Sequence, residues 1–170
     1  MLLFKRLSFA FLATLALSAC GATSEPRPID PNSTADFGIH AVLYNTEGIE
    51  ASVLPERYVL GEDAARHADQ MGKPLYIKLP PLIDKSCLET IEAVTNDLND
   101  AALSINLTPD CGKKFGRFTA RHVGKRMALT INGKMITAPF LRTAITDGGL
   151  LIEGNFETLA DAEAIARQFY

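Results

Sequence analysis

Histidine is scarce in this sequence, and its scarcity argues against an enzyme. The three histidines are His40, His67 and His122, and none is accompanied by the nucleophile and orienting group that a hydrolytic site combines. His122 lies near a predicted helix end, where an imidazole can bond exposed carbonyl groups, so capping is its expected role. No His, Cys and Asp cluster has the spacing of a metal site. We therefore predict a protein without catalysis, metal or cofactor.

Basic residues are also in the minority. The chain has 17 Lys and Arg against 20 Asp and Glu. Lys5 and Arg6 fall in a predicted leader, and their removal leaves 15 basic residues and a net charge of −5. Binding to nucleic acid depends on basic patches that neutralise phosphates. The charge balance therefore argues against a nucleic-acid partner.

A long apolar run is missing as well. The run over residues 7–17 is too short for a transmembrane helix, which needs about 20 apolar residues, and it follows the basic pair Lys5-Arg6, so residues 1–19 are predicted to be a secretory signal peptide. The sequence Leu17-Ser18-Ala19-Cys20-Gly21 resembles the bacterial lipobox, which implies cleavage before Cys20 and its modification by acyl chains such as palmitate. Several acyl chains give stable anchoring where one is marginal. The alternative is an ordinary cleavage site with a chance cysteine.

The mature chain is predicted to have two parts. Residues 20–36 combine the lipidated cysteine with a proline-containing, polar stretch typical of an extended, flexible linker. Residues 37–170 have the length of one domain. Gly21 after the cysteine, rather than aspartate, resembles lipoproteins that pass to an outer membrane. We expect a lipid-anchored protein that faces the periplasm, on the outer rather than the inner membrane.

Short strands and two helices are predicted within this domain. Thr108-Pro109 begins one helix, with the Thr108 hydroxyl as its expected N-cap, and this helix ends before Gly124. Thr158 begins a second helix with Asp161 in a capping box. A further short surface helix is predicted over residues 61–71. Alternation and turn residues predict strands over residues 37–45, 75–79, 88–94, 101–107, 140–145 and 150–154. The expected fold class is α+β, an antiparallel sheet of short strands with two main helices packed on one face.

A hairpin centres on Asn132-Gly133. This dipeptide favours a type I′ turn, which needs positive φ at both central residues. Counting outward from the turn places Leu129 opposite Ile136 and Met127 opposite Ala138. Period-two alternation then gives the hairpin one mostly apolar face.

The motifs of this region occur in a recognisable order. The sequence has a glycine and basic pair at 124–126, a hairpin that ends in Thr137-Ala138-Pro139, the turn Ile145-Thr146-Asp147-Gly148-Gly149, and Ile152-Glu153-Gly154-Asn155-Phe156. This series resembles the periplasmic head subdomain of the SecD protein-export family over about residues 101–169. The membrane-spanning helices of SecD lie outside the resemblance, so transport activity is not implied.

The resemblance implies a binding module. The SecD head is implicated in handling translocating chains, so the expected partners are exported polypeptides or envelope proteins. A strand edge can pair with an extended peptide, and Pro139 lacks the N–H of a continuous ladder. The candidate contact edge is Thr137, Ala138, Pro139, Phe140 and Leu141. One alternative is an ordinary strand end, and another is a structural or docking lipoprotein of an envelope complex.

Two cysteines remain once Cys20 is assigned to the lipid. Cys87 and Cys111 lie in a chain predicted to be exported, where oxidising conditions allow a bridge, and neither has metal-ligand neighbours. We predict a disulfide between the start of the 88–94 strand and the first turn of the helix that begins at Thr108. The alternative is two buried free thiols.

Overall fold

The computed structural model describes residues 27–43, 57–59, 75–153 and 156–170. The predicted signal peptide, Cys20 and the predicted helix over 61–71 lie outside these residues. No helix among the described residues is long and apolar enough to cross a membrane.

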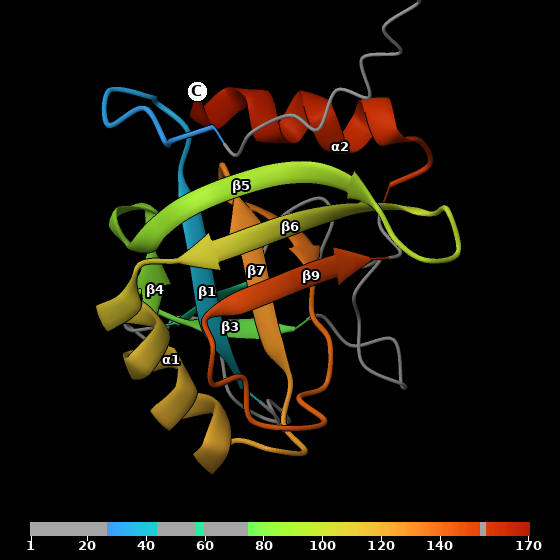
Figure 1. The fold of residues 1–170 in the computed structure, drawn as a ribbon. Helices are drawn as coiled ribbons and strands as arrows, with labels where there is room; N and C mark the ends of the chain where they lie inside the picture. The colour runs from blue at the N-terminus through green and yellow to red at the C-terminus, as the bar shows by residue number, and fades with distance from the viewer. Residues whose placement is uncertain (1–26, 44–56, 60–74, 154–155) are drawn as a thin grey trace, which may run out of the picture.

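The described residues contain nine strands and two α-helices (Figure 1). The strands are β1 (Phe37–Leu43), β2 (Arg57–Val59), β3 (Tyr76–Lys78), β4 (Ile83–Asp84), β5 (Leu88–Thr95), β6 (Ala101–Leu107), β7 (Met127–Ile131), β8 (Lys134–Thr137) and β9 (Gly149–Glu153). The helices are α1 (Pro109–Arg121) and α2 (Leu159–Ala166), with short 3₁₀ turns at Lys85–Cys87 and Arg167–Phe169.

The strands form two antiparallel sheets rather than the single one expected from the sequence. One sheet has the order β2-β3-β1-β7-β8, with β4 also paired to β1, and the other has the order β5-β6-β9. In Figure 1 the three-stranded sheet crosses in front of β1 and β7, and α2 runs along β5. The α+β fold class, with antiparallel short strands and two main helices, is confirmed.

One apolar core joins the two sheets and both helices. Phe37 of β1 and Phe169, just after α2, are fully buried and meet edge to face with ring centroids 6.4 Å apart. Phe115 of α1 belongs to the same buried cluster. The other large, fully buried aliphatic residues of this cluster are Ile39, Ile83, Ile91, Leu103 and Ile105. Each such side chain contributes about 1.5–3 kcal/mol on burial.

The central hairpin has the predicted turn but a different register. Asn132 has φ 51° and Gly133 has φ 75°, as a type I′ turn requires. A bulge between Leu129 and Thr130 pairs Leu129 with Thr137, so the predicted pairing of Leu129 with Ile136 is wrong. The pairing of Met127 with Ala138 is wrong for the same reason, since the Met127 N–H donates to the Pro139 carbonyl at 3.1 Å. The two faces of β8 contact different buried clusters: Ile136 packs against the main core, and Met135 belongs to a smaller cluster.

Helix α1 lies directly on the turn that precedes β9. A Cβ built on Gly148 would lie 3.2 Å from the Gly112 Cα, and Gly148 has φ +79°, a conformation that L side chains rarely adopt. Glycine at both positions therefore allows the two backbones to touch. Thr108 precedes the helix as predicted, but its hydroxyl makes no capping hydrogen bond, which corrects that expectation.

Residues 140–145 form no strand, although their apolar content predicts one. Their sheet pairing is limited to an isolated bridge between Arg126 and Phe140. The Ile145 N–H donates instead to the Thr119 hydroxyl of α1 at 3.0 Å. At Ile145 a helix side chain thus accepts the hydrogen bond that a neighbouring strand would otherwise accept.

The second helix begins as the sequence predicts. The Thr158 hydroxyl accepts from the Asp161 N–H, and the Asp161 carboxylate accepts from the Thr158 N–H, which completes the capping box. Ala162 and Ala166 turn toward the core. This arrangement covers β5 and β6.

Residues 27–36, predicted as part of the linker, contact the domain. The Asp30 N–H donates to the Phe169 carbonyl at 2.8 Å, and Pro28 bridges to Thr90 of β5. Ala35 is buried in the main core, and Ile29 packs against it. These backbone contacts and the two apolar residues together hold the second half of this polar stretch against the fold.

His40 has a structural role that makes stability sensitive to pH. It is buried between the Lys78 carbonyl, 3.1 Å from Nδ1, and the Thr130 hydroxyl, 3.0 Å from Nε2. Burial lowers the pKa of His40, and the Lys78 carbonyl and Asp36 oppose this effect only in part.

We predict that the free energy of unfolding decreases as the pH falls below about 6.5, because the unfolded chain then binds a proton that folded His40 resists. Urea unfolding at pH 7.5 and 5.5 measures this change. The variant His40→Gln, less stable overall, should show a smaller loss between the two pH values. An equal loss in the variant and the wild type would contradict the assignment.

Candidate functional site

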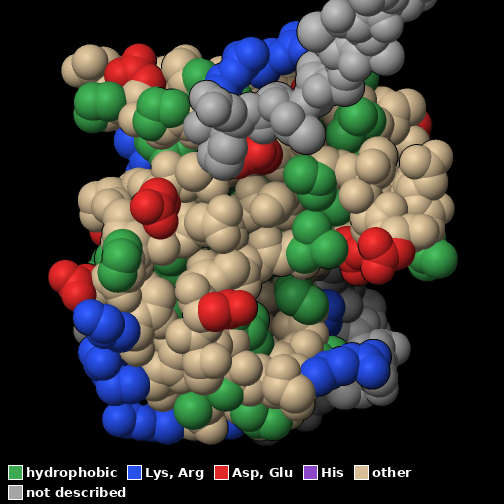
Figure 2. Space-filling model, in the orientation of Figure 1, with side chains coloured by type: hydrophobic (Ala, Val, Ile, Leu, Met, Phe, Trp, Pro, Cys, Tyr) green, Lys and Arg blue, Asp and Glu red, His purple; other side chains and the backbone are tan. Residues whose placement is uncertain are grey.

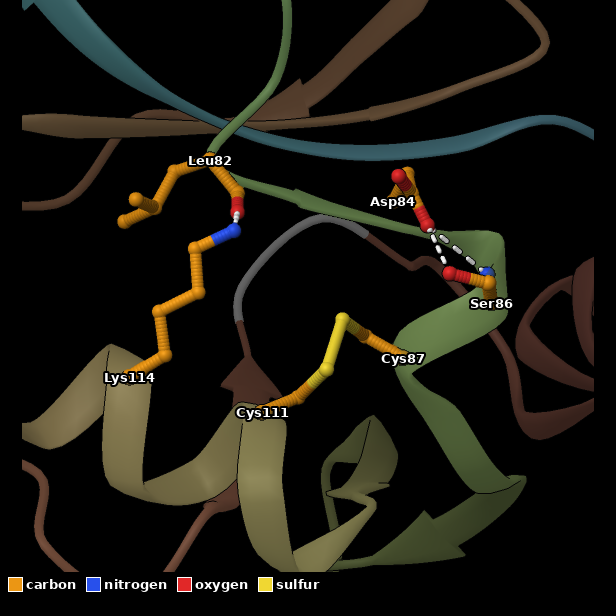
Figure 3. The surroundings of a disulfide bond; sticks show 6 residues. All are labelled: Leu82, Asp84, Ser86, Cys87, Cys111 and Lys114. Atoms are coloured by element: carbon orange, nitrogen blue, oxygen red, sulfur yellow. Dashed lines mark hydrogen bonds between the residues drawn. A yellow bond between two sulfur atoms is a disulfide. The ribbon is translucent and has the colours of Figure 1, made fainter.

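The predicted disulfide is present and ties α1 to the segment before β5 (Figure 3). Cys87 lies at the end of the 3₁₀ turn and Cys111 in the first turn of α1. Next to the bridge, the Lys114 ammonium donates to the Leu82 carbonyl at 2.7 Å. The Thr108 N–H donates to the Cys87 carbonyl at 2.9 Å. The disulfide and these two hydrogen bonds together hold the start of α1 against the segment that precedes β5.

Each sheet ends in a strand that has one neighbour in the part of the chain that the structure describes. Strand β8 pairs with β7, and β9 pairs with β6. The backbone groups on the outer side of such a strand can pair with an added chain. These two edges border the same region of the molecule, because β7, β9 and the segment after β8 line one pocket.

This pocket has a volume of about 220 Å³ and mostly apolar walls. Its lining comes from β1 and β7, from residues 137–145, and from residues 149–152 of β9. Phe140 and Leu151 stand at its rim, and each is 52% exposed. Figure 2 shows a hollow on this face, with hydrophobic side chains at its margin. The arrangement is suited to an apolar side chain from another molecule.

Four of the five predicted edge residues line the pocket. They are Thr137, Pro139, Phe140 and Leu141. Ala138 lies instead in the smaller buried cluster with Ala128 and Met135. Contact of these residues with a peptide stays a prediction.

The wall formed by β9 was not part of the sequence-based site. Leu150, Leu151 and Ile152 all line the pocket. A signal was present in the sequence, because successive residues of a strand point to opposite faces. Three consecutive apolar residues therefore place at least one apolar side chain on the face away from the core.

Arg126 supports the Phe140 side of the pocket. Its Nε donates to the Ala138 carbonyl at 2.6 Å, and its guanidinium carbon lies 5.3 Å from the centre of the Phe140 ring. A guanidinium over an aromatic face is attractive. The Leu141 N–H donates to the Lys125 carbonyl at 2.8 Å, which fixes the next residue as well. Phe140 is thus exposed but held in place.

The remaining candidate groups have structural contacts. His122 Nδ1 lies 2.7 Å from the Phe118 carbonyl, and its ring stacks on Phe118 with centroids 3.8 Å apart, so the predicted capping contact is confirmed. His67 lies outside the described residues. Within the described ranges, no group of three or more His, Cys, Asp or Glu could hold a metal ion.

These features define a small antiparallel α+β domain with an apolar pocket at its sheet edges. The family model "SecDF, P1 head subdomain" matches residues 59–169. The chain belongs to this family of SecD-type head subdomains, as its sequence motifs predict.

Relatives of known sequence are protein translocase subunits. The chain is 37% identical over 87 residues to SecDF of Thermus thermophilus. This alignment covers 51% of this chain and 12% of that protein. It is 30% identical over 137 residues to SecD of Aquifex aeolicus. This alignment covers 79% of this chain and 26% of that protein. The chain therefore spans only a small part of the length of these relatives.

Two solved structures of SecDF have a similar fold. One, described as a membrane component that enhances protein export, has a TM-score of 0.59 and 27% identity, over 79% of this chain and 61% of that one. The other, SecDF in a super-membrane-facing form, has a TM-score of 0.59 and 26% identity, over 79% of this chain and 18% of that one.

Proposed function

We propose that this protein is a non-catalytic, lipid-anchored periplasmic module that contacts exported polypeptides. The observation that carries the proposal is the apolar pocket between two strand edges, with Phe140 and Leu151 half-exposed at its rim. Membership of the SecDF head family supports it, because the relatives are translocase subunits. The proposed contact surface comprises the predicted edge and the outward side of β9.

A polypeptide would bind in extended form. Its backbone would pair with the outer side of β9, and alternate side chains would then point to the same face. An apolar side chain would enter the pocket beside Leu151 and Phe140. Burying one such side chain contributes about 1.5–3 kcal/mol. Because the pocket walls are mostly apolar and present few polar groups, this mode suits many different sequences.

The anchor is a separate part of the proposal. The lipobox-like motif supports acylation of Cys20, with the domain on the periplasmic side of the outer membrane. Incorporation of labelled palmitate into the chain, and its loss in Cys20→Ala, tests the anchor without involving the pocket.

We predict that the double variant Phe140→Ser/Leu151→Ser binds extended peptides at least about tenfold more weakly, because a few residues carry most of the energy of such contacts and these two flank the pocket. Fluorescence anisotropy with a labelled peptide of alternating apolar and polar residues measures the affinity. The matched control is Leu98→Ser/Val123→Ser, which removes two exposed apolar side chains, 81% and 50% exposed, away from the pocket.

The control should bind like the wild type. Equal losses in both double variants, or no binding by the wild type, would overturn the peptide-contact proposal. Crosslinking in cells distinguishes the alternative: many exported chains support the proposal, whereas one stoichiometric envelope partner indicates a docking lipoprotein.

A further inference from the structure

Positive charge is concentrated on α1 and the residues just after it. Residues 109–126 hold six of the 17 basic residues of the chain and one of its 20 acidic residues. The remaining residues therefore carry a clear excess of negative charge. Such a separation of charge gives the domain a preferred orientation near a charged surface.

The cations lie on one side of the helix. At 100° per residue, Lys113, Lys114, Arg117 and Arg121 occupy an arc of about 100°. The opposite side buries Gly112, Phe115, Gly116 and Thr119. In Figure 2 a column of basic side chains follows the position that α1 has in Figure 1. The core thus fixes which side of α1 faces outward, and that side is cationic.

Several of these cations are not engaged within the described part of the chain. Arg117 and Arg121 are exposed, and their side chains make no hydrogen bond or ion pair with any described residue. Lys113 pairs with Asp110 at 3.4 Å, but their side chains are 69% and 97% exposed, so this ion pair is weak. Val123, 50% exposed, adds an apolar side chain at the end of the helix.

We propose that the outer face of α1 binds the anionic phospholipid headgroups of a membrane surface. The cations lie on the exposed side of a single helix. None of them lines the apolar pocket beside β9, or a more polar hollow that Arg27, Glu92 and Tyr170 line. A plane of lipid phosphates can contact all of them together without matched acceptors, and Val123 can enter the interface. An acidic protein surface has its carboxylates at fixed positions, and binding to it would require cations held in a matching arrangement. The inference does not rest on the peptide pocket, which uses other residues.

The test uses the full chain and two kinds of vesicle. One kind contains 30 mol% phosphatidylglycerol (about the level that makes a surface clearly anionic) in phosphatidylcholine, and the other is phosphatidylcholine alone. An acyl anchor inserts into both, so the ratio of the two affinities reports on charge. The wild type should prefer the anionic vesicles, and a salt concentration of about 0.5 M should remove the preference.

The variant Lys113→Glu/Arg117→Glu/Arg121→Glu should lose at least about tenfold of this preference, since each cation near an anionic surface contributes several-fold. All three side chains are exposed, and the neutral variant Lys113→Gln/Arg117→Gln/Arg121→Gln should lose an intermediate amount. The matched control is Lys78→Glu/Lys134→Glu/Arg167→Glu, which changes the net charge equally at exposed positions on other elements. It should keep most of the preference.

Equal losses in the two charge-reversed variants would overturn the proposal, because net charge alone would then explain binding. A wild type without preference for anionic vesicles would overturn it too. If the wild type shows no such preference but binds polyglutamate through the same three residues, the outer face of α1 is a binding site for an acidic protein instead.

Discussion

Replacing Phe115 with alanine will lower the free energy of unfolding by about 3–5 kcal/mol, the range for removing a buried phenylalanine side chain. Phe115 is fully buried and joins α1 to the cluster shared by both sheets. The loss combines the transfer of the ring with the cavity left behind. Denaturant unfolding followed by circular dichroism measures it.

Phe140→Ala is the matched control, since the same atoms are removed from a side chain that is 52% exposed. Its loss should be below about 1 kcal/mol, the usual range for exposed positions. Similar losses at both positions would show that Phe115 does not hold the core together.

Removal of the disulfide is the second large effect. The variant Cys87→Ala/Cys111→Ala should lose about 3 kcal/mol, because the bridge closes a loop with a sequence separation of 24 residues and so restricts the unfolded chain. Both cysteines are replaced so that no free thiol remains. Denaturant unfolding with and without reductant measures the change.

Reductant should destabilise the wild type by a similar amount and leave the double variant unchanged. A wild type whose unfolding midpoint does not respond to reductant, under conditions that reduce the bridge, would contradict the prediction. The remaining attachments of α1, at Gly112 and Phe115, would then hold the helix by themselves.

Local features were predictable from the sequence. The turn at Asn132-Gly133 and the capping box at Thr158 each depend on a few neighbouring residues, and both are present as predicted. The family resemblance also depends on consecutive motifs between residues 124 and 156, and the match to the SecDF head family confirms it.

Features that depend on distant residues were not predictable. Strand β1 pairs with β7, with Phe37 opposite Ile131, and no local pattern indicates that partner. The bulge between Leu129 and Thr130 adds one residue to β8, and alternation within one strand does not reveal it. The pocket itself was not predicted. The sequence indicated only a candidate strand edge at residues 137–141, and the β9 wall meets this segment only once the two sheets are assembled.

The contact between Gly112 and Gly148 has a mechanical consequence. Because backbone touches backbone there, no rotatable side chain lies between α1 and the turn that leads into β9. A displacement of the helix toward this turn would therefore displace the backbone that leads into the β9 wall of the pocket. The cationic helix and the β9 wall of the pocket are therefore joined through direct main-chain contact.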